Sequence, residues 1–193
     1  AELDGLNTAL SSHVVNGYFA AAVAVPDTVS PATPSTWSIL VTLYDARTLS
    51  VIRFLDTLTT AAGVPFVSLV SVGTTLIAIY CPSGTEISAQ FLDTTDATAI
   101  ALGWSAPVVL AVDGDFPFAG LATLIEDKPS TLIDTQSLVD RFALAYRNDS
   151  GGTSQLTVST FDAVATLLET RQINTNSVAP VMLSVDGSIA DTL

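Results

Sequence analysis

The sequence predicts an α+β fold of repeated βαβ units, with a ferredoxin-like βαββαβ core, an added helical segment and a third βαβ unit. Three observations lead to this prediction. The phrase APVVLAVDG at 106–114 returns as APVMLSVDG at 179–187, with a fainter version, VPFVSLVSVG, at 64–73. Apolar runs of strand length alternate with segments whose apolar residues have helical spacing. Each phrase has a Pro near its start and a turn dipeptide at its end, which is typical of a strand that returns after a crossover helix.

The N-terminal part, 1–36, is predicted to be an arm of a helix and a strand followed by a linker. Residues 2–13 have leucines at helical spacing, and Asn16-Gly17 breaks this pattern before the apolar run YFAAAVAV. The stretch PDTVSPATPST at 26–36 contains three prolines, which favours a linker and a domain boundary. Residues 37–193 are then expected to form a single α+β domain.

The split βαβ core is assigned to 37–115. WSILVTLY predicts a strand, and Asp45 is the expected N-cap of a helix over 46–63. This helix would place four apolar residues on one face: Leu49, Ile52, Leu55 and Leu58. VPFVSLVSV and TLIAIYC predict a hairpin through Gly73-Thr74. Ser83 and Glu86 have capping-box spacing and predict a second helix, after which PVVLAVDG closes the core as a strand.

The remaining segment, 116–193, is predicted to hold helices and the third βαβ unit. FPFAGLATLIEDKP and LIDTQSLVDRFALAYRNDSGG are expected to be helical, and in the latter Leu138, Phe142 and Tyr146 recur every fourth residue. SQLTVST predicts a strand, FDAVATLLETRQ a helix capped by Ser159 or Thr160, and VAPVMLSVDG the return strand. The sequence does not decide whether this unit extends the first sheet or lies beside it.

The composition predicts a subunit that needs partners. Of the 193 residues, 49% are hydrophobic and only 13% are charged, so a monomer of this size would leave much apolar surface exposed to water. An alternative is that small residues merely raise the hydrophobic count. The net charge of −13 opposes binding to nucleic acid or to an anionic membrane surface. Adaptation to high salt is a lesser alternative explanation of this acidity.

One uncharged segment, 57–85, has the length of a membrane span. Its prolines, its β-branched residues and the central GTT instead predict two strands joined by a turn. We therefore expect no membrane insertion.

The sequence lacks the residues of common catalytic sites. Its single histidine, His13, lies in a polar stretch and is expected to be solvated or packed rather than catalytic. The single cysteine, Cys81, ends an apolar run and is expected to be a buried, inert thiol. The chain has neither a G-x-S-x-G motif nor a phosphate-binding loop, and its Cys and His are too few for a zinc site. We expect no enzyme activity and no cofactor.

Carboxylates are the remaining route to chemistry. Asp113 and Asp115 follow a predicted strand and Asp186 stands at the matching place in the second copy, so they are weak candidates for a Ca²⁺ or Mg²⁺ site or for an acid–base pair. Asp-Gly is also ordinary turn chemistry, and we favour the turn. Trp37 and Trp104 are expected to be core or interface anchors.

These observations favour a non-enzymatic structural subunit, with copies of itself or other structural subunits as partners. A virus or phage particle, as a capsid or tail component, or an extracellular lattice is the favoured location. The alternatives are a non-catalytic recognition domain that binds through loop 26–36 or 113–118, and a metal-dependent enzyme built on the three aspartates. The same scaffold carries unrelated functions, so the fold alone does not choose between them.

Overall fold

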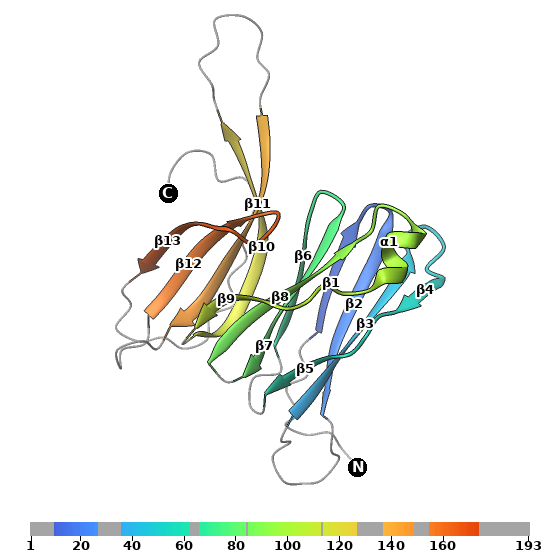
Figure 1. Ribbon diagram of the computed structural model, residues 1–193, viewed down its shortest axis with the longest axis horizontal. Helices are drawn as coiled ribbons and strands as arrows, with labels where there is room; N and C mark the ends of the chain where they lie inside the picture. Colours follow the sequence, from blue (N-terminus) through green and yellow to red (C-terminus); the bar gives the residue numbers. More distant parts are fainter. Residues whose placement is uncertain are drawn as a thin grey trace, which may run out of the picture.

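The protein is an all-β structure of three antiparallel sheets, with one short helix in the part that is described. The computed structural model describes residues 10–26, 36–61, 66–83, 85–112, 114–126, 137–148 and 155–173. We call the three sheets A, B and C in chain order; they follow one another along the long axis of the molecule, and sheet B is the middle layer (Figure 1). The predicted α+β, ferredoxin-like fold is therefore wrong.

Sheet A contains the first five strands. They are β1 (Leu10–Val15), β2 (Tyr18–Pro26), β3 (Thr36–Asp45), β4 (Val51–Phe54) and β5 (Leu58–Ala61). The strand order is β1-β2-β3-β4, and β5 pairs with the other end of β3. Asn16 (φ 45°) and Gly17 (φ 79°) join β1 to β2 in a left-handed two-residue turn, the form that matches the twist of a hairpin. The expected helix over 2–13 is thus a strand from Leu10 onward.

Sheet B is a meander of four strands. They are β6 (Val67–Val72), β7 (Thr75–Ser83), β8 (Glu86–Asp93) and β9 (Val108–Val112). The predicted hairpin through Gly73-Thr74 is confirmed as β6 and β7. Between β8 and β9 lies α1 (Ala97–Leu102), whose N-cap Asp96 accepts hydrogen bonds from the N–H groups of Thr98 and Ala99.

Sheet C contains the last four described strands in consecutive order. They are β10 (Gly114–Glu126), β11 (Ser137–Asn148), β12 (Gln155–Asp162) and β13 (Leu167–Ile173). The predicted strand SQLTVST is confirmed as part of β12. The helix expected over 116–129 and the helices expected on either side of SQLTVST are wrong, because β10, β11 and β13 occupy their described residues.

Sheet B is covered on both faces, and this arrangement creates two cores. One core lies between sheets A and B, and the other lies between sheets B and C. Strand β7 serves both: Leu76, Ala78 and Tyr80 belong to the first core, while Ile77, Ile79 and Cys81 belong to the second. A strand buried on both faces needs apolar residues at every position, which explains the run TLIAIYC.

Polar contacts join the margins of sheets A and B. Ser11 Oγ accepts a hydrogen bond from the N–H of Leu69 (3.0 Å), and His13 Nε2 lies 2.8 Å from Ser71 Oγ. At the opposite margin, Arg53 Nη1 donates to the carbonyl of Ile100 (2.6 Å). The two layers are therefore held by hydrogen bonds at both sides of their apolar core.

Two further helix predictions within 37–115 are also wrong. Where it is described, the segment 46–63 contains the turn after β3, then β4 and β5. The segment that begins at Ser83 contains the last residue of β7 and then strand β8. The residue expected to start the first of these helices has a different role. Asp45 caps a turn, because its Oδ1 accepts hydrogen bonds from the N–H groups of Arg47 and Thr48. Local capping by Asp is common to helix starts and turns.

The repeated phrase marks strands, but not return strands of βαβ units. Two of its three copies contain β6 and β9, which are the two edges of sheet B and pair antiparallel with their neighbours. The copy at 179–187 lies outside the described residues, as do residues 27–35 of the predicted linker. The strands on either side of that linker, β2 and β3, are neighbours in sheet A.

The uncharged segment 57–85 forms strands where it is described. Its hairpin of β6 and β7 agrees with the predicted pair of strands. Among the helices of the described residues, none has the length and apolar character that a membrane span requires.

Candidate interaction surface

The structure does not bring the candidate aspartates together. Asp113 and Asp186 lie outside the described residues, and Asp115 is described only by its backbone, at the start of β10 opposite Arg147. Within the described ranges, no group of three or more His, Cys, Asp and Glu side chains is placed to hold a metal ion. Both interpretations of these aspartates, turn and metal or acid–base site, stay predictions.

His13 is a packed side chain on the inner face of sheet A. It lies in strand β1, not in a segment that precedes the sheets, and it contacts Ser71 on sheet B. Burial of the imidazole lowers the pKa of His13, because desolvation penalises the protonated form. Cys81 is fully buried in the core between sheets B and C, as the sequence predicts. The structure thus places both residues in packing roles.

The two tryptophans lie at the core between sheets A and B. Trp37 is 5% exposed, and Trp104 is partly buried against the same core. Their expected role as core or interface anchors is consistent with a core position.

Two aspartates near α1 accept hydrogen bonds from residues close to them in the sequence. Asp93 Oδ1 accepts a hydrogen bond from the N–H of Thr95 (2.8 Å) and another from its hydroxyl. The bond from the Thr95 hydroxyl, followed by the bond from its N–H, lowers the pKa of the Asp93 carboxyl. Asp96 caps α1. These carboxylates hold turns and a helix end in place.

The side of sheet A that points away from sheet B is an uncharged surface, which we call the outer face of sheet A. The register of β1 to β5 places directly opposed residues on one side of the sheet. The described residues on this side are Ser12, Val14, Phe19, Ala21, Val23, Val25, Ser38, Leu40, Thr42, Tyr44, Val51, Phe54 and Thr59. All of these described members are uncharged, and most are apolar.

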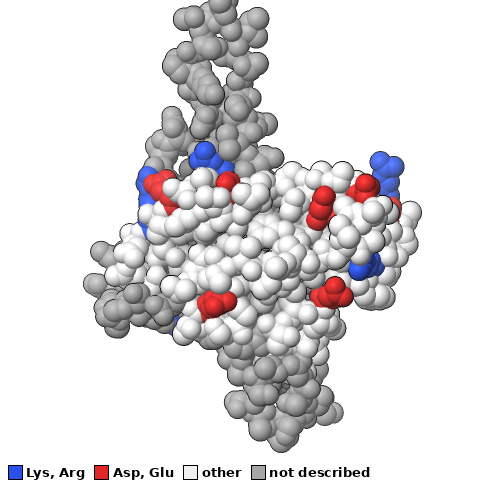
Figure 2. Space-filling view, in the orientation of Figure 1, with Lys and Arg blue, Asp and Glu red and all other residues white. Residues whose placement is uncertain are grey.

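Large apolar side chains on this face are open to water. Phe54 is 74% exposed, Val14 is 61% exposed and Leu40 is 43% exposed. Phe19 and Tyr44 lie side by side, with ring centroids 6.0 Å apart. Figure 2 views the molecule from the side of the stacked sheets, and there the described charged side chains are separate spots with uncharged surface between them. A contiguous apolar patch of this kind is a mark of an interaction site.

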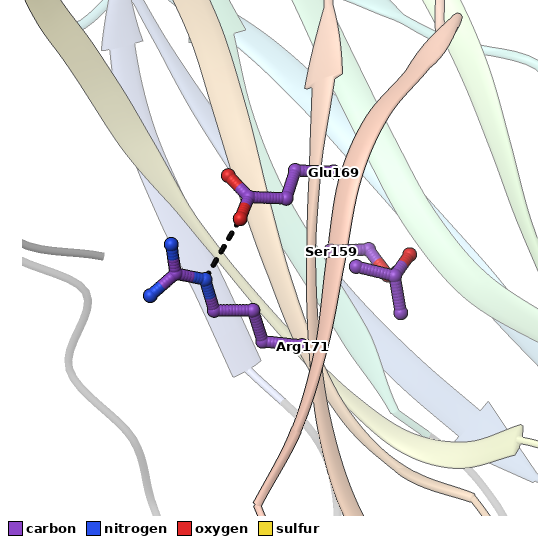
Figure 3. A network of polar contacts seen from close by, with 4 residues as sticks. Ser159, Glu169 and Arg171 are labelled. Carbon is purple, nitrogen blue, oxygen red and sulfur yellow. Dashed lines mark hydrogen bonds and ion pairs between the residues drawn. The ribbon is translucent and has the colours of Figure 1, made fainter.

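The outward face of sheet C is different. The positions facing away from sheet B include Arg141, Arg147, Asp162, Glu169 and Arg171. Arg171 Nε and Glu169 Oε1 form an ion pair of 2.7 Å. Figure 3 shows this pair on one side of β13 and Ser159 on the other. This face therefore includes charged side chains, although Ala143 and Ala145 between the two arginines of β11 are buried.

The sequence contained a signal for the outer face that its interpretation missed. YFAAAVAV and WSILVTLY have apolar residues at both odd and even positions, and so on both faces of the strand, instead of alternating apolar and polar residues. Strands of this kind are typical of sheets that are covered on both faces. In the structure, β2 and β3 are covered by sheet B on one face only.

No protein-family model, curated protein or solved structure matches this chain.

Proposed function

We propose that this protein is a non-enzymatic structural subunit that assembles with copies of itself or with other structural subunits through the outer face of sheet A. The observation that carries the proposal is that this face is uncharged and apolar in a chain whose net charge is −13. Acidic residues are plentiful in the chain, yet every described position on this face lacks them. Contact with another protein would remove its exposed apolar side chains from water.

The hydrophobic effect is expected to stabilise the association. Burial of apolar surface stabilises a contact by roughly 25 cal/mol per Å² removed from water. Phe54, Val14 and Leu40 are the residues with most to gain, because each is a large apolar side chain with a substantial exposed fraction. Ionic groups, which would lose hydration on burial, are absent from the described part of the face.

The expectation of a virion or capsid component has no support from the fold or from the comparisons, and we leave it out of the proposal. The recognition-domain alternative differs from the assembly proposal in one measurable respect. A recognition domain is a stable monomer in the absence of its target, whereas an assembly subunit associates when pure.

Size-exclusion chromatography with light scattering tests the proposal. The expected result is a mass of two or more times the 20.0 kDa chain that persists on dilution through the low micromolar range. Raising the salt concentration should keep or strengthen the association, because salt screens repulsion between acidic chains and leaves apolar contacts intact. A monomer of 20.0 kDa at every concentration and salt level would overturn the proposal.

A further inference from the structure

We infer that the outer face of sheet A binds the same face of a second copy of this chain, so that two sheets A stack face to face about a twofold axis. This inference rests on the proposed function, because it names the partner of the same surface. A twofold contact uses one patch on both subunits, so the patch must complement itself.

The charge balance favours a contact between two uncharged faces. Each copy has a net charge of −13, so two copies repel one another over most orientations. Stacking of the two outer faces brings no described ionic group of either face into the contact. It therefore avoids both like-charge contacts and buried, unpaired charges.

The other outward sheet face does not complement this surface. Stacking sheet C of one copy on sheet A of another would bury Asp162, Glu169 and Arg171 against apolar side chains. Charged groups lose their hydration on burial even when they are paired, and apolar side chains do not replace it. Between the two described outward faces, the outer face of sheet A is therefore the one that fits itself.

The inner face of sheet A shows that this kind of surface packs well. There, Ala20, Ala22 and Ala24 on β2 lie beside Ile39, Val41 and Leu43 on β3, and all are buried against sheet B. One residue further along each strand, the outer face presents similar types, with Ala21 and Val23 beside Thr42 and Leu40. Small residues beside larger aliphatic ones allow two sheets to approach to about 10 Å.

The area of the face is in the range of a specific dimer contact. Four strands at about 4.8 Å spacing and a length of about 30 Å for the nine-residue β2 give a flat area of about 600 Å². Protruding side chains such as Phe54 make the accessible area larger than this flat area. A standard interface buries about 800 Å² on each partner. The flat area of the face is thus at the lower end of the range of standard interfaces, which is about 600–1,000 Å² on each partner.

Leu40 provides the sharpest test because it lies in the middle of the face. It is the fifth residue of the ten-residue β3, with Val23 opposite it on β2. A twofold axis passes through the middle of such a contact, so a central residue lies near its own equivalent on the partner. The experiment compares Leu40→Glu and Leu40→Lys alone and mixed in equal amounts, by light scattering and sedimentation.

Each variant alone should associate about 100-fold more weakly than the wild-type chain or worse, because like charges meet at the axis. The equimolar mixture should form mixed dimers, since Glu then faces Lys. Val164→Glu is the matched control, because Val164 is an exposed apolar residue (75%) in the turn between β12 and β13 and should not affect association. Circular dichroism checks folding, and the pair Thr42→Glu and Thr42→Lys replaces the Leu40 pair if the latter unfolds.

The outcomes separate the inference from the proposed function. A wild-type chain that is monomeric would overturn both. A wild-type assembly that persists in Leu40→Glu, or single variants whose mixture stays monomeric, would overturn the face-to-face pair and leave the assembly function standing. Mixed dimers from two monomeric variants support the inference.

Discussion

Sheet A and sheet B are built from similar residues but differ in how many of their faces are covered. Sheet B is buried against sheet A on one side and against sheet C on the other. Sheet A is buried against sheet B on its inner side only, although its outer side has Val14, Phe19, Leu40 and Phe54. Among the described residues, therefore, sheet B is packed on both faces and sheet A on its inner face.

This comparison locates the apolar excess that the composition indicated. A hydrophobic share of 49% with 13% charged residues predicts that apolar surface remains after folding, but not where it remains. Among the described residues, five of the fourteen exposed large hydrophobic side chains lie on the outer face of sheet A, and these are Val14, Val25, Leu40, Val51 and Phe54. Scattered apolar residues would need no partner, whereas a contiguous face does.

The largest effect on stability is expected from truncating the inward-facing leucine of β3, and the outward-facing leucine of the same strand is the control. Leu43 is fully buried in the core between sheets A and B, and Leu40 points outward. Leu43→Ala should lower the free energy of unfolding by about 2–5 kcal/mol through lost burial and a cavity. Leu40→Ala should change it by less than about 1 kcal/mol in the dissociated chain. Urea unfolding at a concentration below that of association measures both.

Association should respond in the opposite way. Leu40→Ala should weaken self-association, while the folded fraction of Leu43→Ala should associate as the wild-type chain does. Equal losses of stability in the two variants, or association that depends on Leu43 and not on Leu40, would contradict the assignment of inner and outer faces.

Several strands could be predicted from sequence because their signals are local. The hairpin of β6 and β7 follows from two β-branched, apolar runs joined by Gly73-Thr74. β3, β9 and β12 follow from similar runs. Turn residues and β-branched side chains act through the nearby backbone, so one segment is enough to predict them.

The false helices have a physical cause in the spacing of apolar residues. Leu138, Phe142 and Tyr146 recur every fourth residue, which fits one face of a helix and equally one face of a strand, because four is a multiple of two. In β11, Phe142, Leu144 and Tyr146 form that single face and pack in the core between sheets B and C. Leu144, midway between Phe142 and Tyr146, is what distinguishes the two structures, because it shares their face in a strand and lies on the opposite face in a helix.

The interaction surface could not be predicted because it depends on tertiary contacts. Val23 and Ala24 are adjacent in β2 and both apolar, but only the inner one is covered by sheet B. The packing of segments far apart in the sequence decides which face of a strand is covered by a neighbouring sheet. The pattern shows that both sides of β2 are apolar, and the structure shows which side is packed against the described residues of sheet B.

A change in the turn between β3 and β4 tests whether exposure alone makes an interface residue. Leu49 is 66% exposed and has a left-handed backbone (φ 55°), which is unfavourable for a residue with a Cβ atom. Leu49→Gly should raise the free energy of unfolding by about 1 kcal/mol or less, since glycine adopts this conformation without strain. Thermal and urea unfolding measure the gain.

Leu49→Ala is the matched control, because it removes the exposed side chain and keeps the Cβ atom. It should give no gain in stability, and neither Leu49 variant should weaken association, unlike Leu40→Ala. Weaker association in Leu49→Ala would extend the contact beyond the outer face of sheet A. A gain in stability in both variants would show that the side chain, and not the backbone conformation, is unfavourable.

The smallest effect is expected at the margin where sheets A and B meet. Burial lowers the pKa of His13 in the folded chain below its ordinary value of 6.5, so the unfolded chain takes up a proton more readily. The contribution to stability is therefore present above pH 6.5 and is lost as the pH falls from 6.5 through the lower folded pKa. The loss should be small, because the imidazole is only half buried and water screens its charge.

His13→Gln tests this pH dependence, because glutamine keeps a polar nitrogen for Ser71 and does not titrate. The chain has a single histidine, so the difference between wild type and variant between pH 7 and pH 5.5 isolates its contribution. Urea unfolding should show a steeper loss of stability in the wild-type chain over this interval, while acidification affects the carboxylates of both proteins alike. An identical pH dependence in the two proteins would mean that the imidazole is as well hydrated in the folded chain as in the unfolded one, and that sheet B does not bury the inner face of β1 at this margin.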